Sequence, residues 1–319
     1  MKHDLCLCCM TSLAGAKEAE KEAGYHERCA KKIFDTPLLP IVELDDRILE
    51  TLARKSAQDG ITVAGVQKKL SLHLLSEGKQ AAPRLTLLGY PQGYILKPQS
   101  GDFPFLPENE HIVMTMADHA KIRTVPHSLI PLKNGTLAYI TRRIDRASDR
   151  KIHMEDFCQL SERLTEDKYK GSYESCTKII RRFSSRAGLD ASEFFYRLVF
   201  CFITGNSDMH LKNFSLLKGD AGYVQSPAYD LLSVALALPS DKEETALTLN
   251  AKKSRLRGKD FLAFAQTAAI PQNAAKKMIS RLVGMQEEFC RIARSPFLPV
   301  EMQEKLTALI RERCARLIG

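Results

Sequence analysis

The sequence predicts an α+β fold with two lobes, a small β-rich lobe followed by a larger all-helical one. Three observations predict it. Alternating apolar residues indicate short strands before about residue 150, apolar residues at helical spacing dominate after it, and four of the nine cysteines lie near the N-terminus. We therefore expect a Cys/His-containing segment over residues 1–34, the β-rich lobe over 35–148 and the helical lobe over 149–319.

Composition limits the class of protein. The 319 residues are 44% hydrophobic and 27% charged, which is typical of a globular protein with a packed core. Neither a membrane-length apolar run nor a secretory leader is visible, so we expect a cytoplasmic protein with no membrane partner. The net charge of +9 is weak evidence for a polyanionic partner, because the basic residues are scattered. Their densest cluster, residues 252–259, is more typical of a solvated loop.

The N-terminal cysteines have the spacing of a metal site. Cys6 and Cys9 form a C-x2-C pair, and after sixteen intervening residues His26 and Cys29 form an H-x2-C pair. Each pair can hold zinc from one turn while the loop closes on the metal, which gives a structural site. Cys8 is a surplus thiol that could replace a neighbour. The alternative is a small helical N-terminus with reduced, metal-free cysteines.

Four short strands are expected in the β-rich lobe. Leucines alternate with polar residues over residues 70–74, and an apolar run over 94–97 is stopped by a proline. Two further strands, over 127–132 and 136–141, are joined by an Asn-Gly pair that favours a hairpin turn.

Helices are expected before, between and after these strands. Leucine and isoleucine residues between 44 and 52 have helical spacing, and residues 108–122 form an amphipathic helix. The best-marked helix begins with Asp190 as N-cap, has Glu193 at the capping-box position and ends at Gly205. Its apolar residues cover most of the circumference, so we expect a buried central helix, followed by helices near 260–293 and 299–316.

The segment after Gly205 has the pattern of a kinase catalytic loop. Asp208 and Asn213 have the D-x-x-x-x-N spacing, in which the acid meets the attacking hydroxyl and the amide binds magnesium. Asp230 follows where a second magnesium ligand is expected, although the DFG tripeptide is absent. Upstream, Lys97 ends a strand and can neutralise phosphates, and Glu110 in the next helix can pair with it.

A phosphate-covering loop is expected over residues 60–69. Two glycines allow backbone amides to approach phosphates, but the loop matches neither G-x-G-x-x-G nor the P-loop pattern. Each feature alone has an ordinary explanation, such as a turn aspartate, an edge-strand lysine or a helix-terminal glutamate. Their common order along one chain favours nucleotide chemistry.

These residues resemble the HipA-like serine/threonine protein kinases, the toxins of bacterial toxin–antitoxin modules. The motifs that carry the resemblance lie within residues 60–235 and are the blocks 62–69, 94–98, 108–110, 143–146, 205–213 and 229–233. The resemblance implies a two-lobed protein-kinase-like fold that uses ATP and magnesium and phosphorylates a protein hydroxyl. It also implies an aminoacyl-tRNA synthetase as the target, so that translation and growth stop.

The same resemblance assigns roles to individual residues. Asp208 is the catalytic residue, as the base or orienting group, Asn213 and Asp230 bind magnesium, and residues 140–146 form the hinge that holds adenine. The implied nucleotide-binding residues are Thr62, Val63, Ala64, Gly65, Gln67, Lys69, Lys97, Glu110, Arg142, Ile144 and His210. The family autophosphorylates a serine in or beside its phosphate loop, and the matching candidates here are Thr62 and Ser56.

The chain is short for this family, because only some 60 residues precede the phosphate loop. It is similar to the split-type members called HipT, in which a small HipS-like subunit acts as antitoxin beside a HipB-like DNA-binding protein. DNA would then be contacted only through the complex. Two alternatives remain: a small-molecule phosphotransferase of the antibiotic-kinase type, and a catalytically idle, DNA-associated scaffold that binds zinc.

Overall fold

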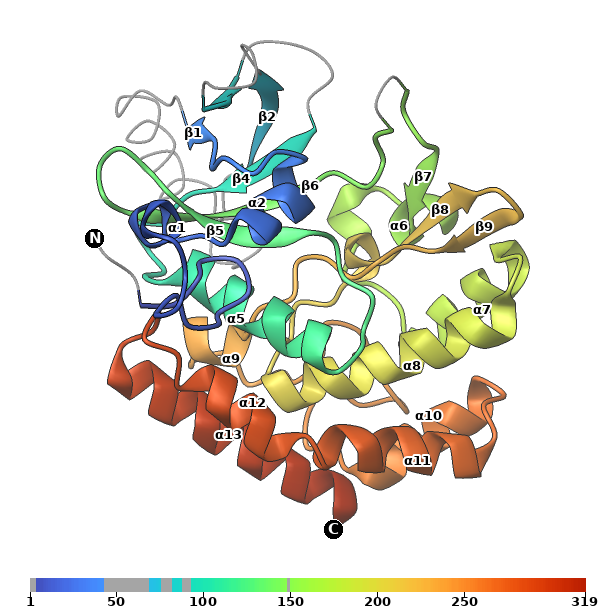
Figure 1. Cartoon of the computed structure of the whole chain (residues 1–319). Helices are drawn as coiled ribbons and strands as arrows, with labels where there is room; N and C mark the ends of the chain where they lie inside the picture. The colour runs from blue at the N-terminus through green and yellow to red at the C-terminus, as the bar shows by residue number, and fades with distance from the viewer. Residues whose placement is uncertain (1–3, 43–68, 76–81, 88–92, 148–149) are drawn as a thin grey trace. The chain divides into compact units, whose positions relative to one another are not determined.

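The computed structural model describes residues 4–42, 69–75, 82–87, 93–147 and 150–319 (Figure 1). The helix expected between residues 44 and 52 lies outside these ranges. The chain divides into two compact units. The first unit comprises Met1–His111 and Val125–Arg150, and the second comprises Ile112–Thr124 and Lys151–Gly319.

The first unit contains a six-stranded sheet with the order β1-β3-β2-β4-β6-β5. Only the β1–β3 pair is parallel among the described strands, and the other neighbours are antiparallel. The strands are β1 (Ile41–Val42), β2 (Leu70–Leu75), β3 (Arg84–Thr86), β4 (Tyr94–Lys97), β5 (His127–Pro131) and β6 (Leu137–Arg142). Two short helices, α1 (Glu18–Ala23) and α2 (Glu27–Phe34), precede the sheet.

The four strands expected from the sequence are present. Strand β4 has the predicted bounds, and β2 extends one residue beyond the prediction. Strands β5 and β6 form the predicted hairpin, with Ile130 opposite Ala138. The turn works because Gly135 adopts a φ of 81°, a conformation that a side chain would disfavour. Strands β1 and β3 were not predicted, since two or three residues carry too little pattern.

Helix α5 (Leu106–His119) is the helix predicted over residues 108–122, and it ends earlier than expected. The chain leaves the helix at Lys121, where φ is 62°, and the amide of Ile122 donates to the carbonyl of Ala117. Every residue from 106 to 117 is buried, so α5 is covered on all sides instead of being amphipathic.

The second unit is mostly helical, but it is not the all-helical lobe that the sequence predicted. Strands β7 (Met154–Asp156), β8 (Ser215–Gly219) and β9 (Gly222–Gln225) form an antiparallel three-stranded sheet. The longer helices are α7 (Tyr173–Phe183), α8 (Ala187–Thr204), α10 (Gly258–Thr267), α11 (Gln272–Val283), α12 (Gln286–Ala293) and α13 (Val300–Ile318). Short helical turns are α6 (Phe157–Leu160), η1 (Thr165–Asp167), η2 (Leu211–Asn213) and α9 (Val234–Ala237).

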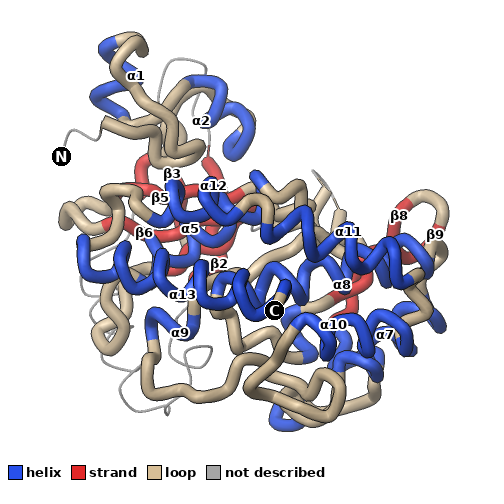
Figure 2. The backbone as a smooth tube through the Cα atoms, turned by 90° about the horizontal axis from the view of Figure 1, so that it is seen from below, coloured by secondary structure: helices blue, strands red, loops and turns tan. Residues whose placement is uncertain are grey.

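Helix α8 is the buried centre of the second unit, as predicted, and packs against α7, α11 and α13 (Figure 2). The prediction that Asp190 caps it was wrong, because the helix begins three residues earlier at Ala187. The Asp190 carboxylate is buried and accepts the backbone amide of Gln225 at 2.8 Å, and it pairs with Arg186 at 2.9 Å. This acid therefore joins α8 to strand β9. Gly205 ends the helix at a φ of 71°, as predicted.

The remaining cysteines are buried thiols, as the sequence predicted. Five free thiols outside the N-terminal segment are buried, those of Cys158, Cys176, Cys201, Cys290 and Cys314. Among the described residues, no helix combines the length and the apolar character that crossing a membrane demands.

Candidate active site

A buried ion pair joins the end of strand β4 to helix α5. The Nζ atom of Lys97 lies 2.6 Å from Oε1 of Glu110, and the two side chains are 2% and 0% exposed. The pairing of β4 with β6 places Lys97 opposite Tyr139, whose ring centroid lies 5.3 Å from Nζ. Because a charge without a partner is costly at such a site, this pair fixes the lysine head group. The structure thus brings together the predicted lysine and glutamate.

A second contact at the start of α5 was missed in the sequence. The amide nitrogen of Gln99 donates to the carboxylate of Glu108, at 2.8 and 2.9 Å from its two oxygens, and also to the carbonyl of Leu137 at 3.2 Å. Burial raises the pKa of Glu108 above its usual value. This contact ties α5 to the segment after β4 and to β6. The sequence around Gln99, which follows Pro98, has no pattern that predicts this contact.

The segment that follows strand β6 is held by arginine–carboxylate pairs. The guanidinium of Arg142 makes two contacts with Asp35, at 3.0 and 2.7 Å. Burial acts to raise the pKa of Asp145, but hydrogen bonds and charge from Arg143 and the charge of Arg146 outweigh it and hold that pKa below its usual value. Ile144 between them is partly exposed. The predicted hinge residues are therefore ordered by their neighbours.

Most of the predicted phosphate loop lies outside the described residues. Lys69 is described and exposed immediately before β2. The other residues predicted for this loop and for autophosphorylation lie outside the described part of the chain: Ser56, Thr62, Val63, Ala64, Gly65 and Gln67.

In the second unit, the loop after α8 carries the predicted catalytic residue Asp208, and Asn206 in this loop connects it to the predicted metal ligand Asp230. Asp208 is partly exposed, whereas Ser207 and Met209 on either side of it are buried. The Oδ1 atom of Asn206 accepts the amide of Asp208 at 3.2 Å, and its Nδ2 atom lies 3.5 Å from the carbonyl of Asp230. One side chain therefore connects the backbones of both acids, a role that the sequence did not reveal.

The predicted metal ligand Asn213 belongs to the same cluster. Its Nδ2 atom donates to the carbonyl of Asp208 at 2.8 Å, from the short 3-10 helix η2. Asp230 is partly exposed and has a φ of 55°, which is unusual for a residue with a side chain and is often found at functional sites. Two carboxylates and an amide oxygen are the donor types that Mg²⁺ prefers.

Tyr169 is a site residue that sequence reasoning missed. Its hydroxyl donates to Oδ1 of Asp208 at 2.7 Å, and its ring meets that of His210 edge-on, with the centroids 5.0 Å apart. His210 is buried, so its predicted contact with nucleotide stays a prediction. Tyr169 lies 39 residues before the loop, too far for a local pattern to reveal the contact.

Further contacts fix the backbone of the loop. The hydroxyl of Tyr173 donates to the carbonyl of Met209 at 3.1 Å, and the hydroxyl of Tyr229 donates to the carbonyl of Lys212 at 3.1 Å. Ser207 donates to Oδ2 of Asp241 at 2.9 Å. The loop is thus anchored by residues that lie before and after it in the chain.

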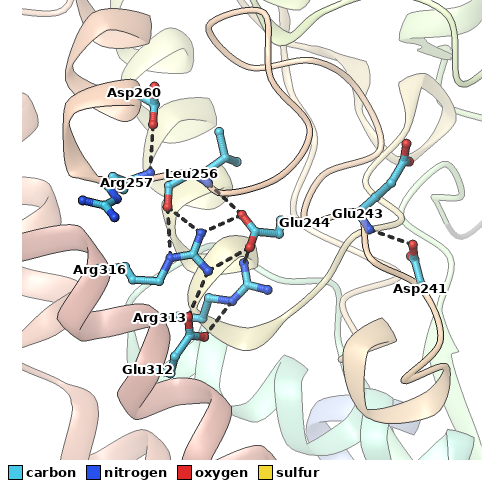
Figure 3. Close-up of polar contacts among 9 residues, drawn as sticks. All are labelled: Asp241, Glu243, Glu244, Leu256, Arg257, Asp260, Glu312, Arg313 and Arg316. Carbon is cyan, nitrogen blue, oxygen red and sulfur yellow. Dashed lines mark hydrogen bonds and ion pairs between the residues drawn. The ribbon is translucent and has the colours of Figure 1, made fainter.

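Asp241 begins a polar network that extends to the C-terminal helix (Figure 3). It accepts the amide of Glu243, and the neighbouring Glu244 is nearly buried and contacts two arginines of α13. Arg316 lies 2.8 Å and Arg313 3.1 Å from Oε1 of Glu244, and the amide of Leu256 donates to Oε2 at 2.9 Å. Through Glu244, the segment over residues 241–257 is therefore attached to α13.

The lysine-rich segment over residues 252–259 is part of this same region. Lys252 pairs with the buried Asp260 at 2.6 Å, and Lys253 pairs with Glu243 at 3.1 Å. The sequence predicted a solvated loop here, and the structure shows that these two lysines pair with acidic residues of the same unit.

The predicted metal ligands of the N-terminal segment also come together. The ligand atoms of Cys6, Cys9, His26 and Cys29 all lie within 4.8 Å of one another. Cys8 is not in this group, and its thiol donates to the carbonyl of His127 at 3.9 Å.

Comparison with known proteins relates this geometry to a family. A model of the HipA-like C-terminal domain matches residues 61–289. The chain is 32% identical over 260 residues to the proposed kinase Y4mE of Sinorhizobium fredii, with 76% of this chain and 60% of Y4mE covered. It is 27% identical over 347 residues to a proposed kinase of Haemophilus influenzae, with 97% of each chain covered. The chain thus spans 60% of Y4mE but nearly all of the Haemophilus protein.

Two solved structures share the fold. One is HipA of the Shewanella oneidensis toxin–antitoxin system, solved with HipB and operator DNA: the TM-score is 0.66 and the identity 20%, with 88% of this chain and 74% of that chain covered. The other is the proinflammatory kinase CtkA of Helicobacter pylori, with a TM-score of 0.52 and 17% identity over 72% of this chain and 87% of that chain. The α+β architecture is therefore one that kinases use.

Proposed function

The chain belongs to the HipA-like C-terminal domain family, and we propose on that basis that it is an ATP-dependent serine/threonine protein kinase acting as a toxin. The observation that carries the proposal is the cluster of Asp208, Asn213 and Asp230 on one backbone frame. The Lys97–Glu110 ion pair supports it, because an active kinase needs a lysine–glutamate pair of this kind.

Asp208 is the residue that acts on the attacking hydroxyl. In the proposed reaction, the hydroxyl oxygen of the protein substrate forms a bond to the γ-phosphorus of ATP, while the bond from that phosphorus to the β–γ bridging oxygen breaks and ADP leaves. The hydroxyl proton passes to the Asp208 carboxylate. Tyr169 donates to the other side of this acid, at Oδ1, and holds it in one orientation.

Asn213 and Asp230 fit the requirements of a magnesium site. The amide nitrogen of Asn213 is used by the carbonyl of Asp208, which leaves the amide oxygen as the donor for a metal. The partly exposed Asp230 supplies a carboxylate, so both donors are oxygen atoms. Magnesium, when bound, neutralises charge on the phosphates.

Lys97 is assigned to the α- and β-phosphates, with Glu110 fixing its position. Residues 62–69 are assigned to the β- and γ-phosphates and residues 140–146 to adenine. Both assignments extend the family resemblance. Thr62 or Ser56 is proposed as the autophosphorylation site.

The proposed substrate is an aminoacyl-tRNA synthetase, and phosphorylation of it would stop translation in the cytoplasm. We propose that the chain is one of the HipT-like members, and this proposal rests on the family resemblance alone. A small HipS-like antitoxin and a HipB-like protein are the proposed partners. The structure of Shewanella HipA with HipB and operator DNA supports a DNA-bound complex of this kind.

A phosphotransfer assay tests the proposal. Purified protein is incubated with γ-labelled ATP, magnesium and a cell extract, and labelled proteins are identified by mass spectrometry. Wild type should label a small set of proteins that includes a synthetase, and Asp208→Asn and Asp230→Asn should lose that labelling by at least about a hundredfold. Asp220→Asn is the matched control, since Asp220 is exposed in the turn between β8 and β9.

Three outcomes contradict the proposal. Equal labelling by wild type and both acid variants would show that these carboxylates do no chemistry. Labelling of a small molecule such as an aminoglycoside, with no growth arrest on expression, would favour the small-molecule phosphotransferase instead. An absence of Mg-ATP binding in a thermal-shift assay would favour the idle scaffold.

A further inference from the structure

We propose that residues 4–35 contain a structural zinc site, formed by Cys6, Cys9, His26 and Cys29, which holds this segment against the edge strand of the sheet. The inference concerns a different part of the chain from the catalytic cluster and does not depend on kinase activity. It rests on the geometry of the four ligands, the small core of the segment and its contacts with strand β5.

The ligand atoms have the separations of a tetrahedral site. In a zinc site with bonds of about 2.3 Å to sulfur and about 2.0 Å to nitrogen, ligand atoms lie roughly 3.5–3.8 Å apart. The Sγ atom of Cys9 lies 3.5 Å from Nδ1 of His26, and all four ligand atoms lie within 4.8 Å of one another. The backbone amide of His26 also lies 3.5 Å from Sγ of Cys6, which brings a donor to that sulfur. A small contraction would complete the coordination.

Local structure explains why the ligands meet. Cys6 and Cys9 flank a tight turn in which the amide of Met10 donates to the carbonyl of Cys6, with Met10 at a φ of 57°. His26 is the N-cap residue of α2 and Cys29 lies in the first turn of that helix. A turn thus presents one pair and a helix start presents the other. Three thiolates and an imidazole that fill four positions are typical of structural zinc.

The segment has little else to hold it together. Helix α1 has six residues with none buried, and α2 has eight residues, which is too short for a helix to be stable alone. An isolated segment of roughly 30 residues usually needs a cross-link, a metal or a partner surface, because it buries little apolar surface of its own. Its buried apolar residues are few besides the cysteines: Leu7, Leu13, Tyr25, Ala30, Ile33 and Phe34.

Residues adjacent to the ligands attach the segment to the sheet. Leu7, which follows Cys6, accepts the amide of Leu129 at 3.1 Å, and the hydroxyl of Tyr25, which precedes His26, donates to the carbonyl of Leu129 at 2.8 Å. Strand β5 is the last strand in the sheet order, so these bonds cover backbone groups at its open edge.

A second contact holds the other end of the segment. The hydroxyl of Tyr94, on the Lys97 strand β4, donates to the carbonyl of Ile33 at 3.1 Å, and the Tyr94 ring packs against Phe34 with centroids 5.6 Å apart. Loss of zinc should therefore weaken the contacts that the segment makes with both β4 and β5. No proposed ligand belongs to either strand.

Metal content is the direct test, made on the full chain purified without chelator. Wild type should contain one zinc per chain by elemental analysis, and replacement with cobalt should give the visible d–d and thiolate charge-transfer bands of a tetrahedral thiolate site. Cys29→Ser and His26→Ala should lose the metal. His26→Cys should keep it, because a fourth thiolate also completes a tetrahedral zinc site.

Cys8→Ser is the matched control, because Cys8 is a buried thiol of the same turn but is not one of the four ligands. It should retain one zinc per chain. A chelator should lower the unfolding midpoint of wild type by several degrees, with recovery on adding zinc and not on adding magnesium. Less than about one tenth of a zinc per chain in wild type, together with no cobalt spectrum, overturns the proposal. Asp208→Asn should keep its zinc, so failure of the kinase proposal leaves this result unchanged.

Discussion

The hydroxyl of Tyr169 donates a hydrogen bond of 2.7 Å to Oδ1 of Asp208, and this bond sets the orientation of the acid in the loop after α8. Tyr169 lies in the segment just after η1. In the same segment, the carbonyl of Lys168 accepts a hydrogen bond from the amide of Leu211. The proposed catalytic loop is therefore supported by a segment that precedes it by some 40 residues in sequence.

Tyr169→Phe should lower kcat about tenfold and leave the KM for ATP nearly unchanged. A hydrogen bond to a charged group contributes about 1.5 kcal/mol, and 1.36 kcal/mol corresponds to tenfold in rate. Steady-state kinetics of the purified variant check this. Tyr223→Phe is the control, because its hydroxyl contacts His153 at 3.2 Å on the surface of the small sheet. A change in KM alone would assign Tyr169 to nucleotide binding instead.

Lys97→Met should lower the free energy of unfolding by about 3–5 kcal/mol, since it leaves a fully buried Glu110 without its lysine. The double variant Lys97→Met, Glu110→Leu should recover most of that stability, because an apolar pair of similar size removes the buried charge. Phosphotransfer should be absent from both. Urea unfolding and the labelling assay measure the two effects separately, and activity in the stable double variant would exclude Lys97 from phosphate binding.

Asp145→Asn should cost about 1 kcal/mol of stability near pH 7, because Asp145 accepts hydrogen bonds from Arg143 and pairs with Arg146. The folded-state pKa of this acid lies below its unfolded value, so the stabilisation is present above about pH 4 and is lost as the pH falls through the folded pKa. The stability difference between wild type and variant should thus be constant from about pH 7 to pH 5 and shrink below about pH 4. Urea titrations across this range would refute the assignment if the difference grew on acidification.

Glu244→Gln should destabilise the second unit by about 2–3 kcal/mol, because two arginines of α13 lose their nearly buried partner. Glu243→Gln is the matched control one residue away, since Glu243 is exposed and pairs only with Lys253 among the ion pairs of the described residues. Its effect should be within about 0.5 kcal/mol. Equal effects from the two variants would show that the Glu244 network does not stabilise the fold.

The sequence predicted those features that depend on local pattern. The hairpin of β5 and β6 followed from an Asn-Gly pair, and β2 and β4 followed from alternating or continuous apolar residues. The Lys97–Glu110 pair is correct because both residues come from adjacent elements, 13 positions apart. The four proposed zinc ligands were predicted from spacing alone, and the structure brings their ligand atoms within 4.8 Å of one another.

Features that depend on distant partners were missed. Strand β7 pairs with β8 some 60 residues later, so neither short strand shows its partner in the local sequence. Asp190 looked like a helix cap because aspartate favours that position, but its partners are the amide of Gln225 and Arg186. Tyr169 and Gln99 contact site residues across tertiary structure, which no spacing rule reveals.

The side chain of Asn206 contacts the main chain of both acidic residues, at the amide of Asp208 and the carbonyl of Asp230. The backbone conformation of the loop therefore does not depend, through Asn206, on the two carboxylate side chains. Carboxylates at 208 and 230 can be exchanged for amides while the chain keeps its path, whereas trimming the asparagine would displace both at once. An inert but correctly shaped version of this protein, suitable for trapping its bound partners, is therefore best made at the acids and not at Asn206.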